Sequence, residues 1–330
     1  MEIRMKNTKR VALSFLAILP SIAFAGPIAL LKDQTLTNQW QTFEFDSSFS
    51  NAAIFSSMNV IIENKDTLYE DYTFNIKNVV SGNGSDKGSF QARVDWDSAN
   101  APDTSVNASF LIAQQGLHTI GGSVIEVGTI NSSQGEFRHQ FTTEFLSRPL
   151  LLLEQQTKQN EGNTNSYELT KASETTSSAF TAVRQQSNNA LSSSLETTAY
   201  IAVSKESEII EEDSATIVLG DLLSDNTRQA KYFDVPNLSE FVFFSEINGV
   251  PYSPGAVTDT SQYTQSNSSE STITGFINEG ASRDGRHTVE HVALIGFRIE
   301  STLVDEPRTL FLMFISIVLF RKSLFSKPSN

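Results

Sequence analysis

Residues 195–203, LETTAYIAV, form a short and mostly apolar segment. A related segment, VEHVALIGF, occupies residues 289–297, and a looser form, NASFLIA, occupies residues 107–113. Each of them closes a section of roughly ninety residues, and self-similarity at a regular period is the sequence signature of a repeated structural unit. We therefore interpret the body of the chain as one unit built three times.

The earlier parts of the three sections also correspond. They open with IALLK at 28–32, VIEVG at 124–128 and TIVLG at 216–220. Such repeated spacing predicts equivalent core positions in all three units. Thirteen residues after each opening stands a phenylalanine, and each closing segment is centred on one large apolar or aromatic residue: Phe45, Phe141 and Phe233, then Phe110, Tyr200 and Leu294.

Short runs rich in Phe, Val, Ile, Thr and Tyr alternate with Ser, Asn, Gly and Asp clusters, which indicates strands joined by turns. The run LLLLEQQTKQ at 150–159 by itself is compatible with a helix, but Pro149 and the apolar counterparts at 52–55 and 241–244 favour a buried strand. The sequence thus predicts an all-β fold of three tandem antiparallel β-sandwich domains of about 90 residues. A signal helix is expected before them and a hydrophobic helix after them.

These patterns place the segment boundaries. A signal peptide is expected at 1–25, sandwiches at 26–117, 118–210 and 211–303, and a sorting or anchor tail at 304–330. Short links are expected near 116–122 and 206–214. The second link is acidic but lacks the alternating ligands and central Gly of an EF-hand, so a solvated connector is favoured over a calcium site, and no other cofactor is expected. Its acidic residues are Glu206, Glu208, Glu211, Glu212 and Asp213.

Composition excludes several classes of protein. The chain has 39% hydrophobic residues and 23 Phe, enough for packed cores, and no Cys, so disulfides, thiol catalysis and thiolate metal sites are absent. Removing residues 1–25 deletes four basic residues and one acidic residue and takes the net charge from -14 to -17. An acidic body repels phosphate backbones, so nucleic acid is a poor candidate partner.

The N-terminus has the three parts of a secretory signal. A basic start containing Arg4 and Arg10 precedes an apolar run at 11–24, and Ala23 and Ala25 are the small residues that a signal peptidase requires. Cleavage is therefore predicted after Ala25. A buried N-terminal helix is the alternative, but it leaves the basic residues unexplained.

The C-terminus combines a short motif, an apolar run at 310–320 and a basic cluster. The run is about half the roughly twenty residues that a membrane-spanning helix needs. This tail resembles the PEP-CTERM sorting signal of Gram-negative bacteria, which implies export through the inner membrane and recognition by an exosortase-like enzyme. Asp305 departs from the motif, where the first Pro is usual, and a plain membrane anchor is the alternative. The residues concerned are Val304, Asp305, Glu306, Pro307, Arg321 and Lys322.

The units themselves resemble a family of lectins. The runs RPLLLLEQQT (148–157), AFTAVRQQ (179–186) and LETTAYIAVSKE (195–206) are similar to the H-type lectin domain. Unit three keeps His287-Thr288 and Glu290 before its closing strand, unit two keeps Glu196, and unit one has Val106 at that place. The resemblance implies six-stranded sandwiches that often trimerise and bind galactosamine-type sugars, although fold similarity does not transfer the activity.

Five residues are candidates for ligand binding. Glu196, His287 and Glu290 stand where a closing strand begins, and the alternative for them is a structural role in fixing the strand. Trp40 and Trp96 occur in unit one only, and aromatic rings can stack on the apolar faces of sugars. Core packing is the equal alternative for both tryptophans.

The segment His287–His291 also fits the inverted zinc-protease pattern H-x-x-E-H. That chemistry needs both histidines on one helical face, whereas a strand separates them by about 13 Å at ~3.3 Å per residue. No third ligand is apparent. No catalytic set repeats or converges, so an enzyme is not expected and a secreted hydrolase is the weakest reading. Multivalent binding of exopolysaccharide by a surface or matrix protein is favoured, and a structural envelope spacer without a specific ligand is the alternative.

Overall fold

The structure is a computed structural model, and it describes residues 22–58, 72–96, 105–132, 135–158, 168–186, 195–212, 214–224, 229–248, 260–265, 272–278 and 290–299. The regular secondary structure of the described part is almost entirely β-strand, and every strand pairing in it is antiparallel, as predicted. Its strands form six sheets, and each of the three units contributes one four-stranded and one three-stranded sheet. The predicted signal helix and C-terminal helix lie outside the described residues, apart from residues 22–25.

Unit 1 contains the first seven strands. Its sheets have the strand orders β1-β2-β7-β4 and β3-β6-β5. The strands are β1 (Ile22–Ala25), β2 (Ile28–Leu36), β3 (Gln41–Phe45), β4 (Ala52–Met58), β5 (Tyr72–Val80), β6 (Gly88–Trp96) and β7 (Val106–Gln114).

Unit 2 repeats this arrangement with the orders β8-β9-β14-β11 and β10-β13-β12. Its closing strand β14 is the segment ETTAYIAV, paired on one side with β9 and on the other with β11. The strands are β8 (Gly116–Ile120), β9 (Ser123–Ser132), β10 (Gly135–Gln140), β11 (Leu150–Gln155), β12 (Glu168–Thr175), β13 (Ala179–Gln186) and β14 (Glu196–Val203).

Unit 3 has the orders β15-β16-β21-β18 and β17-β20-β19. A short 3-10 helix, η1 (Leu238–Glu240), precedes β18. The strands are β15 (Ile209–Glu212), β16 (Ala215–Ser224), β17 (Gln229–Tyr232), β18 (Val242–Ile247), β19 (Thr260–Gln265), β20 (Thr272–Asn278) and β21 (Glu290–Ile299).

The two faces of each four-stranded sheet are buried in different cores. In β14, Tyr200 and Ala202 face the interior of the unit 2 sandwich, whereas Ala199, Ile201 and Val203 face a second cluster that all three units share. Burial on both faces explains why this strand is a continuous apolar run rather than an alternating one. The run Leu150–Leu153 of β11 is divided between the two cores in the same way.

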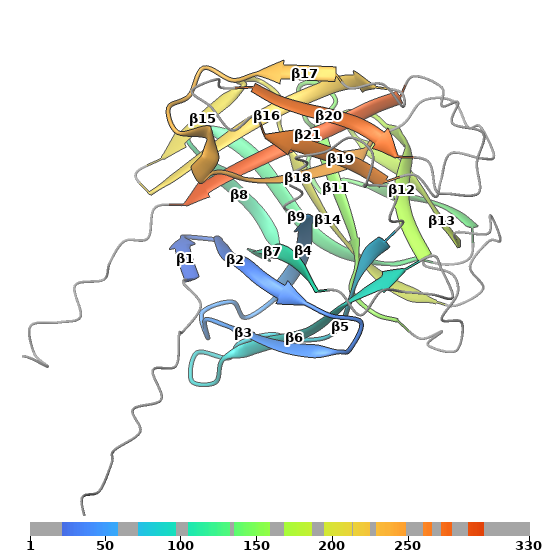
Figure 1. Cartoon of the computed structure of the whole chain (residues 1–330). Coiled ribbons are helices and arrows are strands. Elements are labelled where there is room, and N and C mark those ends of the chain that lie inside the picture. Colours follow the sequence, from blue (N-terminus) through green and yellow to red (C-terminus); the bar gives the residue numbers. More distant parts are fainter. Residues whose placement is uncertain are drawn as a thin grey trace, which may run out of the picture.

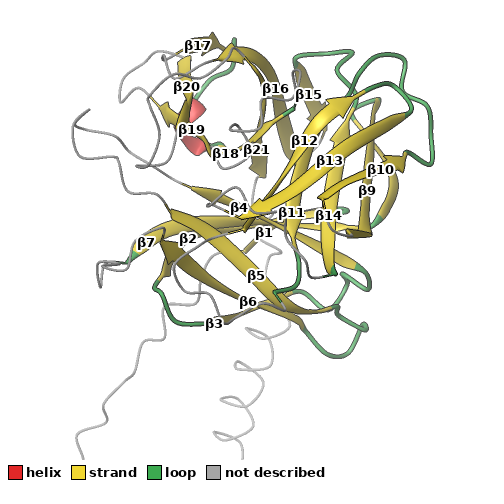
Figure 2. Ribbon diagram, turned by 90° about the vertical axis from the view of Figure 1, so that its right-hand side faces the viewer, coloured by secondary structure: helices red, strands yellow, loops and turns green. Residues whose placement is uncertain are grey.

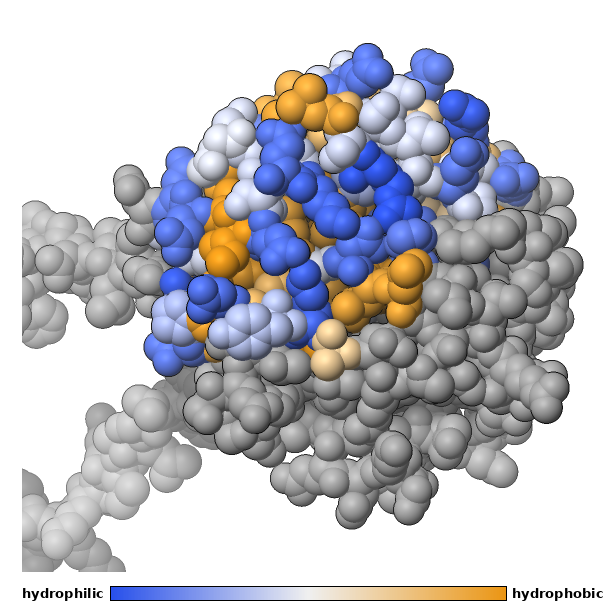
Figure 3. Space-filling view, turned by 90° about the horizontal axis from the view of Figure 1, so that it is seen from above, coloured by the Kyte–Doolittle hydropathy of each residue, from blue (hydrophilic) through white to orange (hydrophobic). Residues whose placement is uncertain are grey.

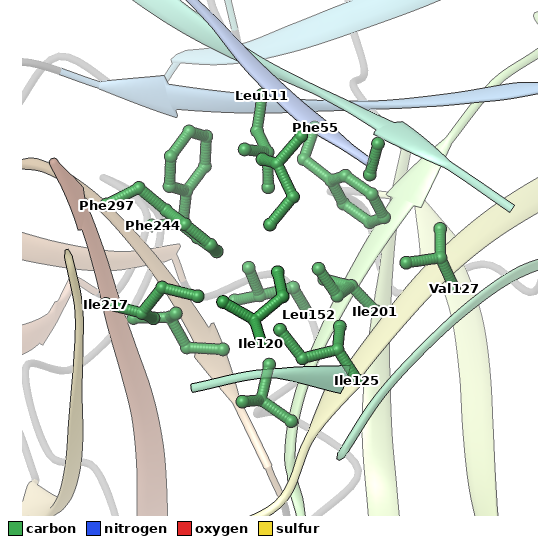
Figure 4. Close-up of a cluster of buried hydrophobic side chains, with 14 of the residues drawn as sticks. Phe55, Leu111, Ile120, Ile125, Val127, Leu152, Ile201, Ile217, Phe244 and Phe297 are labelled. Atoms are coloured by element: carbon green, nitrogen blue, oxygen red, sulfur yellow. The ribbon is translucent and has the colours of Figure 1, made fainter. Parts of the chain in front are cut away.

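The shared cluster, called here the central core, lies where the three four-stranded sheets face one another (Figure 4). Equivalent positions from each unit meet there: Phe55, Leu152 and Phe244 from β4, β11 and β18, and Leu111, Ile201 and Ile295 from the closing strands. The three sandwiches are therefore three lobes around one centre rather than a row (Figures 1 and 2).

Side-chain amides connect neighbouring units at this centre. Gln156, just after β11, accepts a hydrogen bond from the Ile54 amide at 2.9 Å and donates one to the Ile54 carbonyl at 2.7 Å. Asn248, just after β18, makes the same pair of bonds with the backbone of Leu151 at 2.8 and 2.7 Å. The third junction is closed by a hydrogen bond from the Ser57 hydroxyl to the Phe243 carbonyl.

Ile54, Leu151 and Phe243 are equivalent positions of β4, β11 and β18. The repeated contacts therefore relate the units by an approximate threefold rotation, and a rotation of this kind keeps corresponding ends of the lobes at one level along its axis. The chain forms internally the kind of trimer that separate subunits form in symmetric oligomers.

Both predicted links and three of the predicted boundaries coincide with strands in the structure. The expected connectors near 116–122 and 206–214 contain the strands β8 and β15, so the boundaries at 117 and 210 fall within strands. Both strands gain backbone pairing with β9 and β16, which their polar composition did not indicate. The last four residues of the predicted signal peptide form β1, which pairs with β2.

Candidate functional site

The strongest candidate surface lies on unit 1 around Trp40, between β2 and β3. The ring of Trp40 is partly buried, and two cations lie over it: Lys77 Nζ at 4.1 Å and Arg93 Cζ at 4.5 Å from the ring centroid. Cations at these distances are attracted by the ring quadrupole. We call Trp40, Asn75, Lys77, Arg93, Asp95 and Lys158 the Trp40 cluster.

Charges from two units meet in the Trp40 cluster. Asp95 of β6 pairs with Arg93 at 2.7 Å and also with Lys158, which comes from the end of β11 in unit 2. Lys158 Nζ donates a further hydrogen bond to Asn75 Oδ1 at 3.0 Å. Arg93 and Lys158 thus share the Asp95 carboxylate, and Lys77 lies over the ring of Trp40, although the chain as a whole is acidic.

Two hydrogen-bond donors of the cluster have no acceptor in the structure. They are Trp40 Nε1 and Asn75 Nδ2, and both atoms are buried. Buried donors in proteins are nearly always paired with protein or water. A partly buried aromatic ring with cations beside it suits a ligand that carries an apolar face and carboxylate oxygens, whereas the two unpaired donors lie beneath the surface.

Trp96 is the last residue of β6 and pairs with Tyr72 of β5, at the end of the sheet β3-β6-β5 where Trp40 precedes β3. The side chain of Trp96 is outside the described part of the structure. The structure therefore places both tryptophan positions at one end of unit 1. The side chains of His287 and Glu290 also lie outside the described residues, although Glu290 begins β21 opposite Ser224.

Glu196 begins β14 and is only 1% exposed. Its carboxylate accepts a hydrogen bond from the Thr157 hydroxyl, and Thr157 Oγ1 in turn accepts one from the Thr197 amide at 2.8 Å. The side chain therefore ties the end of β11 to the beginning of β14. Glu196 belongs to unit 2 and Glu290 to unit 3, whereas Trp40 and Trp96 belong to unit 1.

His291, the last residue of the H-x-x-E-H segment, lies on strand β21 as the repeat predicts. Its Nδ1 is 2.9 Å from Asp221 Oδ1 and 3.1 Å from Arg148, and Lys205 also pairs with Asp221, at 2.8 Å. Burial alone would raise the pKa of Asp221, but the hydrogen bonds from Lys205 and His291 and the charge of Arg148 hold it below its ordinary value. This cluster joins units 2 and 3.

In the described part of the chain, no group of three or more His, Cys, Asp or Glu side chains is arranged to hold a metal ion. The acidic link instead contributes Glu212, which accepts a hydrogen bond from the Gly121 amide at 2.5 Å. Gly121 has a φ of +52°, and a Cβ at this position would lie 2.5 Å from the Glu211 carbonyl, so the contact between β8 and β15 depends on glycine.

Sequence reasoning missed a buried polar network in unit 2. Tyr200 donates a hydrogen bond to Glu126 at 2.8 Å, Glu126 also accepts one from the Thr142 amide at 2.9 Å, and His139 lies 3.1 Å from the Tyr200 hydroxyl. Burial, followed by the bond to Glu126, raises the pKa of Tyr200, and burial lowers that of His139. The equivalents of His139 and Glu126 in unit 1 are Phe43 and Ala29, so no repeat pattern could reveal the network.

A second missed residue is Glu154, where units 1 and 2 meet. Its carboxylate accepts hydrogen bonds from the amide and hydroxyl of Ser56 at 3.0 and 2.5 Å. Burial raises the pKa of Glu154 to about 7, although the bonds from Ser56 and from the Gln155 amide oppose the rise. This carboxyl group therefore titrates near neutral pH.

Ala23 and Ala25 lie on β1, whereas all residues of the sorting motif and the basic cluster that follows it lie outside the described residues. Among the described residues, no helix has the length and hydropathy to cross a membrane. Seen from above, the described surface is largely hydrophilic, with apolar residues in separate small patches (Figure 3).

The sequence matches no protein-family model and no curated protein sequence.

Proposed function

We propose that the chain is an exported, non-enzymatic protein of the bacterial cell surface or extracellular matrix that binds exopolysaccharide. The observation that supports this most strongly is the approximate threefold arrangement of the lobes around the central core. H-type lectins, which the units resemble, often trimerise, and here three units within one chain have the corresponding arrangement. An assembly of this kind suits binding to a repetitive polymer.

Multivalency supplies the affinity in this proposal. Corresponding ends of the lobes lie at one level of the threefold axis, so one polymer chain or network can contact several lobes at once. Linked weak sites raise avidity by roughly 10²–10⁴ when the geometry permits simultaneous contact. Because the three lobes share the central core and are not joined by free linkers, little entropy is lost in positioning a second or third contact with the polymer.

The Trp40 cluster suggests the kind of sugar polymer. The tryptophan provides an apolar surface, and Lys77, Arg93 and Lys158 provide positive charge in an otherwise acidic protein. Acidic polysaccharides complement both features, because their sugar rings have apolar faces that can stack on tryptophan and carry carboxylates that attract cations. The cations over Trp40 would have to move aside or share the ring with the sugar.

Export and sorting complete the proposal. The basic and apolar N-terminal segment directs the chain through the inner membrane of a Gram-negative bacterium, and the PEP-CTERM-like tail is read by an exosortase-like enzyme. The chain is then released or anchored at the surface, where exopolysaccharide is present.

The test is retention of the purified chain on immobilised exopolysaccharide from its own organism, with competition by uronic acids and neutral monosaccharides. Trp40→Ala should weaken binding by about tenfold or more, the usual cost of removing an aromatic anchor. Tyr232→Ala is the matched control, because Tyr232 is 61% exposed at the far end of unit 3. Competition by neutral sugars alone would contradict the acidic ligand, and equal binding by both variants would contradict the role of Trp40.

The structural spacer is a second candidate with one observation in its favour. Glu196 is buried, and two cations already occupy the ring of Trp40, so these candidates have structural partners of their own. A spacer predicts no retention on exopolysaccharide even at millimolar concentrations of binding sites. The retention experiment therefore distinguishes the two functions directly.

A further inference from the structure

Three side chains of the Trp40 cluster are buried together where unit 2 packs against unit 1. Asn75 is 5% exposed, and the side chains of Lys158 and Asp95 are 5% and 16% exposed. Lys158 Nζ donates a hydrogen bond to Asn75 Oδ1 at 3.0 Å and also contacts the Asp95 carboxylate. A primary amine, a carboxamide and a carboxylate therefore meet at one point that is largely shielded from solvent.

The surrounding backbone holds these groups in place. Asn75 lies on β5 and Asp95 on the paired strand β6 of unit 1. Lys158 follows two residues after Gln156, whose side-chain amide is fixed on the backbone of Ile54. The amine thus comes from one unit and its two partners from the next. Groups that are already held together lose little entropy when they react.

The amine is also close to the carbonyl carbon of the carboxamide. Because a C=O bond is about 1.2 Å long, Asn75 Cγ lies no more than about 4.2 Å from Lys158 Nζ. Reacting atoms in near-attack arrangements are about 3–3.5 Å apart. A shift of about 1 Å or less in the lysine side chain therefore brings the two atoms to that separation.

The nitrogen that the amine would replace makes no contact that must be given up. Asn75 Nδ2 is buried and has no hydrogen-bond acceptor in the described part of the structure. An unpaired buried donor is costly. After an exchange of nitrogens, the one hydrogen that remains on Nζ faces Asp95, with which Nζ is already in contact. The exchange therefore removes an unpaired donor.

We propose that Lys158 and Asn75 form an amide bond that joins units 1 and 2 covalently, with Asp95 as the proton carrier. Asp95 takes a proton from the Lys158 ammonium group, and the lone pair of Nζ attacks Asn75 Cγ. Asp95 passes the proton to Nδ2, the Cγ–Nδ2 bond breaks, and the nitrogen leaves as ammonium with the second proton from Nζ. One C–N bond forms and one breaks, without any oxidation or reduction.

Asp95 is suited to this task because it begins and ends the reaction as a carboxylate. Arg93 Nε lies 2.7 Å from Asp95 Oδ1 and remains its partner after the charge of Lys158 is lost. No buried charge is then left without a counterion, which would be strongly destabilising. The same ion pair opposes a direct amide between Lys158 and Asp95, because a carboxylate is a poorer electrophile than a carboxamide.

The bond gives the chain a covalent tie that it cannot obtain from cysteine, which the sequence lacks. It closes the chain between residues 75 and 158, and a closed loop stabilises a protein by restricting the unfolded state. Lys77 and Arg93 stay over the ring of Trp40. The cross-link is therefore compatible with polysaccharide binding and does not depend on it.

The experiment is intact-mass spectrometry of the purified full chain, followed by tryptic peptide mapping. The intact mass should fall short of the mass of the sequence, counted from the mapped N-terminus, by about 17 Da, the mass of ammonia. Trypsin should not cut after Lys158 and should release one branched peptide that contains both Asn75 and Lys158. In a denaturing gel, the cross-linked chain should migrate faster than a linear one.

Three variants assign the roles, with circular dichroism to show that each one is folded. Lys158→Arg keeps the positive charge but has no primary amine, so it should show the full mass and migrate as a linear chain. Asp95→Asn should slow bond formation by at least about a hundredfold, measured as the cross-linked fraction over time. Lys87→Arg is the control, because Lys87 pairs with Glu44 at an exposed site, and it should keep the loss of mass.

Four results would overturn the proposal. The full mass in the unmodified chain would leave Lys158 in an ion pair, and a loss of about 18 Da with a branch at Asp95 would move the bond to that residue. A loss of about 17 Da without the branched peptide would assign it to another asparagine or glutamine. Equal rates in Asp95→Asn would remove Asp95 from the reaction. Polysaccharide retention is measured separately, so the inference and the proposed function fail separately.

Discussion

At the scale of single residues, the ionisation of Glu154 affects the contact between units 1 and 2. Glu154 lies on β11 at the junction with unit 1, and its carboxylate accepts hydrogen bonds from the amide and the hydroxyl of Ser56. Because burial raises its pKa to about 7, the protonated form dominates at acidic pH and the charged form at alkaline pH. The junction between units 1 and 2 should therefore weaken when this group ionises.

The sign of the effect follows from the two pKa values. The ordinary value for Glu is 4.5 and the folded value is about 7, so the stabilisation is complete below 4.5 and is lost as the pH rises through 7. Between pH 5 and 8 the free energy of unfolding should fall by about 2–3 kcal/mol relative to Glu154→Gln, which stays neutral. Urea unfolding at several pH values measures this. Glu44→Gln, at an exposed site, should leave the pH dependence unchanged, and a parallel dependence in Glu154→Gln would contradict the assignment.

Sequence reasoning identified some of the decisive residues and not others. Tyr200, Phe110 and Leu294 were predicted to fill equivalent core positions, and they are 3%, 0% and 1% exposed. Repeated spacing was sufficient for them, because a core position recurs in every unit. Glu154 and Glu126 depend on partners from other strands or units, and their equivalents in the other units are different residues, so spacing carries no information about them.

At the scale of elements, β4, β11 and β18 determine how the lobes are joined. Each of them forms the edge of its four-stranded sheet beside the closing strand. Their apolar runs were predicted as buried strands, and the structure confirms them. The amides of Gln156 and Asn248, which bind the backbone of the neighbouring unit, were not predicted, because polar residues after a strand normally indicate a loop. β8 and β15 were missed for a similar reason, since short polar segments become strands only when a neighbouring edge pairs with them.

Removing one of these amides should weaken its junction. Gln156→Leu leaves the amide and carbonyl of Ile54 buried without partners, which should cost about 2–4 kcal/mol. Asn248→Leu should have an effect of the same size through Leu151. Chemical denaturation measures both, and Gln39→Ala, at an exposed position, should change stability by less than about 0.5 kcal/mol. A loss below that value for both variants would mean that the side-chain amides of Gln156 and Asn248 contribute nothing to the stability of the assembly.

At the scale of the whole molecule, the expected row of sandwiches is instead three lobes around one centre. The sequence indicates that the sandwiches pack against one another, because strands such as Ala199–Val203 are apolar on both faces and one sandwich can bury only one face. It did not say which surface would cover the second face. A solvent-exposed link would have kept the units apart, whereas β8 and β15 are built into the sheets and draw consecutive units together.

Small-angle X-ray scattering of the exported chain tests this arrangement most directly. A single compact body of residues 26–299 should have a radius of gyration of about 19 Å, and the tail should add only a few ångströms. Three separate sandwiches in a row should instead exceed about 25 Å and give an elongated distance distribution. A compact, nearly symmetric distribution is the result that we predict, and an elongated one would contradict the central core.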